Sequence, residues 1–599
     1  MSLNIFLPHL KAPETSAEPS RPSRARRLLG ALGPTWLASP ARRGVQSASL
    51  VLFLVLFFYV AWPYGSPDYD ATRRSKELIE AEAFLALDPL VSLSTALAAR
   101  AWVWSLAWAG AILAVCIVFP RAFCGYVCPL GTLIDLFDWA IGKRVARRRR
   151  ARRGWWVHLK YDVLLGTLVA AACGVLVTGF LAALPVVTRA LFFLLAPVQM
   201  GVLKGWYLIP PMNAGHYVSV ALFAVVLGLG FLRPRFWCRH VCPSGAIFAV
   251  ANALRLHERK VGSACIRCNK CLDACPFDAI EPNYATRAAD CTFCQTCGGV
   301  CPAHAITFAA RWYRENLPSS PETANGSPGK IAALEPALSR RGFLAGAAGG
   351  LLAVGGVQHL FGARTGKPGT VWPVRPPGSV PEPLFLQLCI RCGECFQACP
   401  NSVLQPLGFD QGLDGLWTPQ VVAGWSGCEP KCNNCGQVCP TGAIRALPMD
   451  EKRAARIGLA VVNEQTCLPY ARREACQMCV DECRAAGYDA IEFIRVGAEA
   501  DTDGKPIEDT GFLAPVVLAD KCVGCGLCET RCHKINVRLK RLLSETAVRV
   551  AAGPGNEDRL TSGSYVALRE KERLEKKTKP VETQKPDGAS DGYLPDFLK

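Results

Sequence analysis

The sequence lacks the motifs by which common substrate-converting enzymes are recognised. It contains no phosphate-binding P-loop, no dinucleotide-binding glycine fingerprint and no catalytic triad pattern. Its most glycine-rich stretch, residues 346–356, lies in an apolar segment, where small residues favour the close packing of helices. The sequence therefore identifies no independent substrate-converting site and no catalytic residue.

Histidine is scarce, and none of the eight histidines lies in the middle of an apolar segment. A haem inside a bilayer needs axial ligands such as histidine within the membrane-spanning segments. The sequence therefore predicts no haem that could carry electrons across the membrane. His216, at the start of an apolar segment, is a candidate hydrogen-bond partner for quinol, with an ordinary interfacial histidine as the alternative. The eight are His9, His158, His216, His240, His257, His304, His359 and His533.

Charged residues make up only 19% of the 599 residues, whereas hydrophobic residues make up 50% and the mean hydropathy is +0.19. The net charge is nevertheless +18. The 30 cysteines are too dilute for a disulfide-stapled miniprotein and too frequent for an ordinary enzyme. Composition thus disfavours a plain cytosolic enzyme, a disordered chain and a small secreted scaffold, and favours a membrane protein that carries metal.

Several apolar segments approach the ~20 residues that a membrane-spanning helix needs. Tryptophan and tyrosine residues lie near their ends, where interfacial aromatic belts are expected. A shorter stretch, residues 190–203, is expected to lie at the membrane interface or to re-enter the membrane. The four main candidates are residues 47–64, 102–120, 163–184 and 217–232, and a fifth, rich in glycine and alanine, is 343–361.

Basic runs flank these segments and set the expected orientation, because lysine and arginine favour the cytoplasmic side. Arg21–Arg27, the pair Arg42 and Arg43, and Lys143–Arg153 place the N-terminus in the cytoplasm. A few basic residues in the loop after the first segment conflict mildly with this. Since the runs flank apolar segments, nucleic-acid binding is the less favoured interpretation.

Twenty-four cysteines form six quartets with ferredoxin-like spacing. Quartet one is Cys265, Cys268, Cys271 and Cys275, and quartet two is Cys291, Cys294, Cys297 and Cys301. Both match the bacterial run C-x2-C-x2-C-x3-C-P, in which the fourth cysteine ligates the neighbouring [4Fe–4S] cluster. We therefore expect Cys275 to ligate the cluster of quartet two, and Cys301 that of quartet one. Zinc also takes four thiolates, but two intact runs with the proline favour iron–sulfur.

Four further quartets follow in the second half of the chain. Quartet three is Cys389, Cys392, Cys395 and Cys399; quartet four is Cys428, Cys432, Cys435 and Cys439; quartet five is Cys467, Cys476, Cys479 and Cys483; and quartet six is Cys522, Cys525, Cys528 and Cys532. Quartets four to six depart from the full pattern in gap length or in the closing proline, changes that loops tolerate because the thiolates stay. Two exchange schemes for the fourth cysteine are open: neighbour pairing (three with four, five with six) and nested pairing (three with six, four with five).

Two further pairs have the form C-x3-C-P. Motif one contains Cys124 and Cys128, and motif two contains Cys238 and Cys242. Each follows an expected inward-running helix, so the four thiols could meet at one depth and hold a metal or cluster, or act as redox dithiols. Turn-forming helix ends are the alternative, and the ligand is left unassigned. The last two cysteines, Cys116 and Cys173, lie inside expected helices, where packing explains them.

The stretch Ser339-Arg340-Arg341-Gly342-Phe343-Leu344 matches a twin-arginine export signal. This signal exports folded proteins, which suits a domain whose clusters are assembled in the cytoplasm. No A-x-A cleavage site follows, so we expect an uncleaved anchor. A positive flank of the apolar segment is the alternative interpretation.

These features predict a multi-domain membrane protein of the bacterial inner membrane. It would combine a four-helix transmembrane domain, a cytoplasmic α+β ferredoxin domain with two [4Fe–4S] clusters, a fifth anchor helix, and a periplasmic α+β polyferredoxin domain with four clusters. The expected boundaries are 1–45 for a basic cytoplasmic segment, 46–250 for the transmembrane domain, 255–310 for the ferredoxin domain, 311–337 for a linker, 338–362 for the signal and anchor, 380–545 for the polyferredoxin domain and 566–599 for a disordered tail.

Basic side chains near a cluster favour its reduced state. Arg267 and Lys270 are therefore expected to raise the potential of the quartet-one cluster. Lys521, Arg531 and Lys534 are expected to do the same for quartet six.

At this point the chain resembles two known families joined. Residues 45–305 resemble NapH, the membrane ferredoxin-type component of periplasmic nitrate reductase systems, in their helices, C-x3-C-P pairs and two ferredoxin runs. Residues 338–545 resemble NapG and MauM in the twin-arginine start and four quartets.

The resemblance implies a quinol dehydrogenase component. Electrons would pass from the quinol pool through clusters to a periplasmic acceptor, a nitrate reductase-type enzyme or a c-type cytochrome. An assembly factor that supplies electrons or handles metal for a periplasmic metalloenzyme is the alternative, and a redox-sensing regulator is a third, for which no output domain is visible.

Overall fold

The computed structural model describes residues 34–61, 83–142, 158–203, 206, 209–312, 340–355, 372–499, 507 and 510–578. The chain forms two compact units. Unit 1 runs to Ser426 and includes Asn434–Ala446, whereas unit 2 contains Gly427–Asn433 and continues from Leu447. The basic runs Arg21–Arg27 and Lys143–Arg153, Ser339, most of the expected linker and the tail beyond 578 lie outside the described residues.

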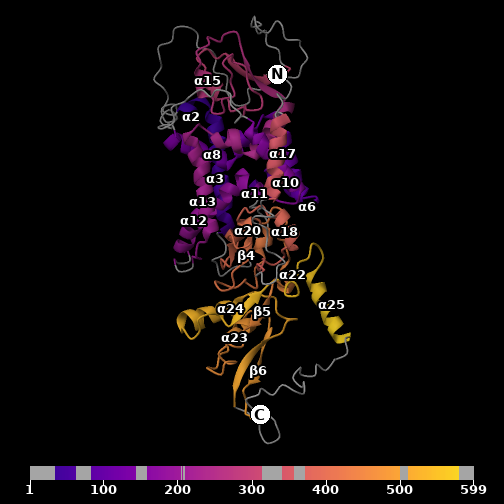
Figure 1. Ribbon diagram of the computed structural model, residues 1–599. Helices are drawn as coiled ribbons and strands as arrows, with labels where there is room; N and C mark the ends of the chain where they lie inside the picture. The colour runs from indigo at the N-terminus through magenta and orange to yellow at the C-terminus, as the bar shows by residue number, and fades with distance from the viewer. Residues whose placement is uncertain are drawn as a thin grey trace. The chain divides into compact units, whose positions relative to one another are not determined.

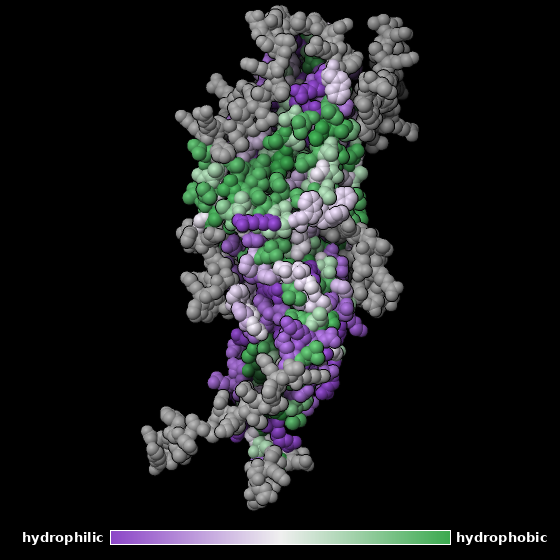
Figure 2. Space-filling view, turned by 90° about the vertical axis from the view of Figure 1, so that its right-hand side faces the viewer, coloured by the Kyte–Doolittle hydropathy of each residue, from purple (hydrophilic) through white to green (hydrophobic). Residues whose placement is uncertain are grey.

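Apolar helices form most of unit 1 (Figure 1). Proline occupies the first turn of α6, α8 and α14, where its fixed backbone angle suits a helix start. Figure 2 shows hydrophobic side chains gathered over the surface of these helices. They are α2 Pro34–Ala38, α3 Pro40–Ala61, α5 Ala83–Ala86, α6 Pro89–Ala99, α7 Ser105–Val118, α8 Pro129–Phe137, α10 Leu159–Ala172, α11 Thr178–Leu181, α12 Ala183–Leu203, α13 Ala214–Gly228, α14 Pro243–Ala251 and α17 Arg340–Gly355, with π-helical turns η2 Phe123–Val127, η3 Asp138–Gly142 and η7 Trp237–Val241 and short 3-10 turns η6 Leu229–Phe231 and η8 Asn252–Leu254.

Three described helices are long and apolar enough to cross a membrane, namely Pro40–Val60, Ala183–Val202 and Ala214–Phe231. The expected four spanning helices are therefore not confirmed. The expected helix 163–184 is wrong, because α10 ends at Ala172 and Gly174 turns the chain with a φ of +82°. The segment 190–203 is also not a separate interfacial stretch, since it belongs to the 21-residue helix α12.

The glycine-rich helix α17 packs against α10, as the sequence predicts for a small-residue surface. A Cβ atom on Gly346 would lie 2.9 Å from the carbonyl oxygen of Asp162, and one on Gly350 would lie 2.7 Å from that of Gly166. Only glycine allows these two helix backbones to approach so closely.

The segment expected to form the ferredoxin domain, residues 255–310, lies in unit 1 and contains one antiparallel strand pair. Strand β1 (His257–Val261) pairs in antiparallel register with β2 (Ile306–Ala310), and the short helices α15 (Lys270–Ala274) and α16 (Thr296–Gly299) follow the cysteine loops. A second cysteine-bearing region of unit 1 contains α18 Glu382–Leu388, α19 Glu394–Gln397, β3 Leu404–Pro406, α20 Gly412–Gly415, β4 Pro419–Val421 and α21 Asn434–Gln437.

Unit 2 contains two antiparallel strand pairs, β5 with β8 and β6 with β7. The expected single domain of residues 380–545 is thus divided between the two units. The expected disordered tail is wrong for its first part, because residues 565–578 form helix α25, whose Tyr565 is fully buried. The elements are α22 Met449–Ala454, β5 Leu459–Val462, α23 Met478–Ala485, β6 Ile491–Val496, β7 Phe512–Val517, α24 Leu527–Cys532, η11 His533–Leu539, β8 Val548–Ala551 and α25 Tyr565–Thr578.

Candidate metal centres

Cysteines of two quartets line one cavity in the ferredoxin domain. Cys291, Cys294 and Cys297 of quartet two meet there with Cys275, the last cysteine of quartet one. Burial, together with the neighbouring Cys294 thiol, raises the pKa of Cys275 to about 12. The structure thus places Cys275 beside quartet two, as the sequence predicts, whereas the placement of Cys301 in quartet one stays a prediction.

Arg259 on β1 is a buried cation beside these cysteines that the sequence analysis missed. Its Nη2 lies 3.9 Å from the sulfur of Cys271 in quartet one. Its charge also lowers the pKa of Cys291 and Cys297 in quartet two, against the larger raising effect of burial. Arg259 therefore stabilises thiolates on both sides, at a position that only the strand pairing of β1 with β2 brings there.

Cys294 is the most thiolate-prone cysteine of this cavity. Burial raises its pKa, but Arg42 and the side chains of Thr292 and Thr296 outweigh burial, so the pKa is lowered overall. Arg42 entered the sequence analysis only as part of a basic flank that sets the orientation of the first apolar segment. It is buried, with 3% of its surface exposed, because α3 begins at Pro40 and carries it inside.

A second cavity in unit 1 holds quartet three. Cys389, Cys392 and Cys395 line it together with Cys439, the last cysteine of quartet four. The backbone N–H of Ile444 donates to the sulfur of Cys439 at 3.5 Å. The structure therefore pairs quartet three with quartet four, which is the neighbour scheme.

Unit 2 shows the same exchange between quartets five and six. Cys532 of quartet six acts on the pKa of Cys479 together with Cys476 and Cys467, and Asn536 Nδ2 lies 3.6 Å and 3.8 Å from the sulfurs of Cys476 and Cys532. Cys483 of quartet five conversely lies beside Cys522. The nested scheme is thereby ruled out for the described geometry.

The basic residues that were expected to raise the cluster potentials are poorly placed to do so. Arg267 and Lys270 are exposed to solvent, where charges are strongly screened. Lys521 lies 3.5 Å from Glu492, and Arg531 lies 3.7 Å from Glu482, so each has an acidic partner. Among the described residues, no three His, Cys, Asp or Glu side chains converge tightly enough to hold a single metal ion.

The C-x3-C-P motifs meet inside the helices of unit 1. Cys128 and Cys242 are buried, Cys124 and Cys238 are half-buried, and the four interact electrostatically with one another. Each motif forms a π-helical turn that ends where α8 or α14 begins. The two motifs therefore lie together, and joint ligation by their four thiols stays a prediction. Of the two single cysteines, Cys116 is buried and Cys173 is exposed.

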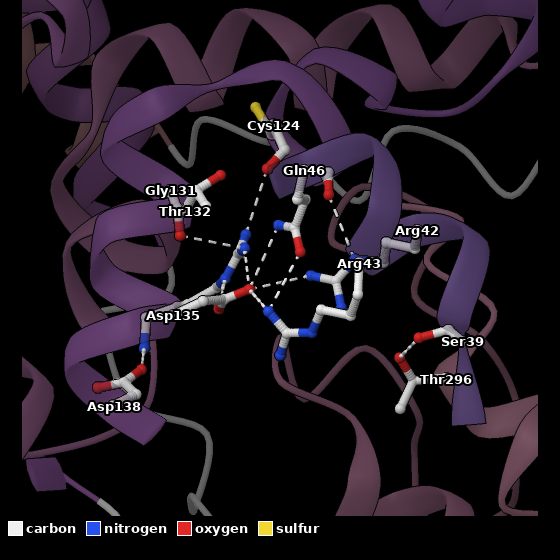
Figure 3. Close-up of polar contacts among 12 residues, drawn as sticks. Ser39, Arg42, Arg43, Gln46, Cys124, Gly131, Thr132, Asp135, Asp138 and Thr296 are labelled. Carbon is white, nitrogen blue, oxygen red and sulfur yellow. Dashed lines mark hydrogen bonds and ion pairs between the residues drawn. The ribbon is translucent and has the colours of Figure 1, made fainter. Parts of the chain in front are cut away.

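A network of buried charges around Asp135 lies beside this site (Figure 3). The carboxylate of Asp135 accepts from Arg42 at 3.3 Å, from Arg43 at 2.9 Å and from Arg235 at 2.6 Å and 2.7 Å. Gln46 adds a fourth donor at 3.3 Å. Three guanidinium groups thus share one carboxylate and leave an excess of positive charge at the site.

A separate cavity of about 80 Å³, partly open to solvent, lies between α12, α13 and the quartet-three loop. Its lining is mainly apolar, with phenylalanine, methionine and proline side chains, but it includes His216, Gln405 and Cys399. His216 Nδ1 is engaged by Asn213 at 2.9 Å, which leaves Nε2 for a ligand. The buried Nε2 of Gln405 has no hydrogen-bond partner among the described residues.

Comparison with known proteins identifies relatives of part of the chain. A family model described as a 4Fe-4S binding domain matches residues 101–149 and 216–263, and a second model of that description matches residues 261–281 and 385–405. The methylamine utilization ferredoxin-type protein MauM of Paracoccus denitrificans is 34% identical over 234 residues, which cover 36% of this chain and 92% of MauM. The ferredoxin-type protein NapG of Escherichia coli is 36% identical over 205 residues, or 33% of this chain and 83% of NapG. No solved structure matches the chain.

Proposed function

Because the chain belongs, through about a third of its length, to the family of the ferredoxin-type proteins MauM and NapG, it is an iron–sulfur electron-transfer protein, and we propose that it takes its electrons from membrane quinol. The cysteines of the six quartets would hold [4Fe–4S] clusters, which accept one electron at a time when bound. The resemblance of residues 45–305 to NapH supports the same proposal, since NapH is the membrane component of periplasmic nitrate reductase systems.

The observation that carries the quinol proposal is the apolar cavity beside Cys399. Quinone rings are flat and apolar with an oxygen at each end, and they suit a mainly apolar cavity with a few polar groups. His216 Nε2 and Gln405 Nε2 supply two such groups, and the unpaired amide of Gln405 would regain the hydrogen bond that its burial costs. Phe193 holds the imidazole of His216, with the ring centroids 4.4 Å apart.

Quinol oxidation would involve His216, the apolar lining of the cavity and the neighbouring loop of cluster ligands. Oxidation of quinol to quinone releases two electrons and two protons, which must leave by different routes. His216 would accept the two protons one after the other at Nε2 and pass each to water, while the ring lies beside a loop that carries predicted cluster ligands. The apolar lining would exclude water from the quinone ring. Electrons would continue to a periplasmic acceptor, which we propose to be a c-type cytochrome or a nitrate reductase-type enzyme.

The experiment compares cluster reduction by quinol in two variants of α12. Ala196→Phe fills the cavity, whereas Val198→Phe makes a similar change at a position that is 53% exposed and does not line it. We expect Ala196→Phe to slow quinol-driven reduction at least tenfold, measured by electron paramagnetic resonance, and to leave reduction by dithionite unchanged. Val198→Phe should match the parent protein.

Equal rates in both variants would contradict the cavity as the quinol site. No reduction of the parent protein by any quinol would favour the alternative of an assembly factor. We also propose that the ferredoxin domain faces the cytoplasm and unit 2 the periplasm. A reporter fused at residue 450 that is active in the cytoplasm would overturn this orientation.

A further inference from the structure

The two C-x3-C-P motifs present their second cysteines in the same local structure. Cys128 is the N-cap of α8 and Cys242 is the N-cap of α14, and a proline follows each. The N–H of Gly245 donates to the sulfur of Cys242 at 3.4 Å, and the N–H of Gly131 bonds Cys128 in the same way. Helix N-termini and N–H···S bonds both stabilise thiolates.

The arginine that precedes each motif bonds to the other motif. Arg121 donates to the carbonyl oxygen of Gly245 at 3.2 Å, and Arg235 donates to that of Gly131 at 3.3 Å. Both guanidinium groups also lie over the ring of Phe277, at 5.5 Å and 4.8 Å. The two motifs therefore form one interlocked site rather than two separate turns.

The charge of this site fits an anionic occupant. Arg121 and Arg235 are at most 1% exposed, and Arg42 and Arg43 share the carboxylate that Arg235 bonds. Buried positive charge is costly unless negative charge lies nearby. Four thiolates that hold an iron–sulfur cluster carry a net negative charge, so this ligand set and its surroundings match.

The site lies on the path between the two cluster cavities of unit 1. On one side, Gly125 of motif one packs against Thr292, with 3.1 Å from an added Cβ to the Thr292 carbonyl oxygen. On the other side, Cys392 packs against the same hydrophobic core that contains Cys128 and Cys242. The cysteines are thus contiguous, through packed side chains, with both cavities.

The length of helix α10 gives the distance between the quartet-two and quartet-three regions. Lys160 in its first turn pairs with Asp290, next to Cys291, at 2.7 Å. Gly174, just beyond its end, lies against Gln387, near Cys389. At about 1.5 Å per residue the two contacts are about 20 Å apart. Electron tunnelling slows exponentially with distance, so an intermediate centre would shorten the longest step.

We propose that Cys124, Cys128, Cys238 and Cys242 together ligate one further iron–sulfur cluster, which relays single electrons between the quartet-two and quartet-three cavities. In each transfer one cluster is oxidised by one electron and its neighbour is reduced by one, with no bond made or broken. That these electrons come from quinol rests on the proposed function.

The test compares two cysteine variants of the full chain, purified without oxygen. Cys124→Ser with Cys238→Ser removes one ligand from each motif, whereas Cys173→Ser changes an exposed cysteine outside both motifs. We expect the double variant to lose ~4 irons per chain, the content of a [4Fe–4S] cluster, and one paramagnetic signal after dithionite reduction. Reduction of the ferredoxin-domain clusters by quinol should slow at least tenfold. Cys173→Ser should keep the parent values.

Unchanged iron and signals in the double variant would overturn the proposal, even if quinol still reduces the protein. Conversely, loss of iron in a protein that quinol never reduces would support the cluster while rejecting the proposed function. If the double variant does not accumulate, mass spectrometry of the unmodified protein decides. A disulfide between any two of the four cysteines would show a dithiol switch and overturn the proposal, whereas iron-dependent protection of all four from alkylation would support it.

Discussion

The two C-x3-C-P motifs share a backbone but neutralise their buried arginines differently. Arg121 and Arg235 both have a left-handed backbone, with φ of 51° and 54°. Arg235 binds the carboxylate of Asp135 with two nitrogens, whereas Arg121 donates to carbonyl oxygens and also bonds to the thiol of Cys124. Asp135 lies seven residues after the second cysteine of motif one, and the matching position in motif two is Ala249.

The two C-x3-C-P motifs therefore share their backbone conformation, whereas the residues packed around each motif determine how its buried arginine is neutralised. The carboxylate of Asp135 also binds Arg42 and Arg43 of α3, so motif two is tied by charge to the first long helix. Arg121 instead holds the loop at Ala289 and Asp290, so it ties the helices to the ferredoxin domain. Arg235 thus forms its ion pair within the helices, whereas Arg121 bonds to the ferredoxin domain.

The largest expected effect comes from removing the shared carboxylate. Asp135→Asn leaves Arg42, Arg43 and Arg235 without a neutralising partner, and an uncompensated buried charge costs about 3–5 kcal/mol. We expect the thermal unfolding midpoint in detergent to fall steeply. Asp138→Asn is the matched control, since Asp138 accepts the backbone N–H of Arg235 at 3.1 Å and asparagine keeps that acceptor. Similar losses in the two variants would contradict the role given to Asp135.

The second-largest expected effect is the loss of stability when either arginine is replaced. Arg235→Met removes two charged hydrogen bonds to Asp135, each worth about 1.5–3 kcal/mol, but Arg42 and Arg43 still neutralise that carboxylate. Arg121→Met removes bonds to carbonyl oxygens and to the Cys124 thiol but none to a carboxylate, so we expect a smaller loss of about 1–2 kcal/mol. Unfolding in detergent measures both. An equal or larger loss for Arg121→Met would show that the motifs are not asymmetric in charge.

Sequence reasoning found the cysteines of this site, but not what surrounds them. Local spacing predicted where the thiols lie and that Cys275 belongs beside quartet two, because three or four residues of loop geometry decide such positions. Arg259 and Asp135 were missed, since strand pairing and helix packing bring them from more than 10 residues away to the sulfurs that they affect. In the sequence analysis one apolar segment ended at residue 184 and the next began at residue 190, within helix α12. A buried arginine such as Arg189 looks like a loop residue until its partners are known. Those partners are the carbonyl oxygens of Gly179 and Arg391, at 3.0 Å and 2.9 Å.

A third comparison concerns the contacts of each motif with the ferredoxin domain. Tyr126 of motif one donates to the carbonyl oxygen of Phe293 at 2.7 Å, and Arg239 of motif two pairs with Asp278 at 2.9 Å. Tyr126→Phe should cost about 1 kcal/mol whatever the salt concentration. Arg239→Met should cost about 0–1 kcal/mol and less at high salt, because Asp278 is partly exposed. Unfolding at low and high salt separates the two, and a salt-dependent cost of Tyr126→Phe would argue against this assignment.

The smallest expected effect is that of filling the glycine after each proline. A Cβ on Gly131 would lie 3.4 Å from the carbonyl oxygen of Cys124, and one on Gly245 would lie 3.3 Å from both Arg121 Nη2 and the carbonyl oxygen of Cys238. Since these contacts need shifts of only a few tenths of an ångström, each alanine variant should change stability by less than about 1 kcal/mol. Gly245→Ala should cost slightly more, because it also displaces the guanidinium of Arg121. If Gly131→Ala proves clearly the more damaging in the same unfolding assay, the two motifs differ in backbone as well as in charge, and the shared geometry on which the comparison depends would be wrong.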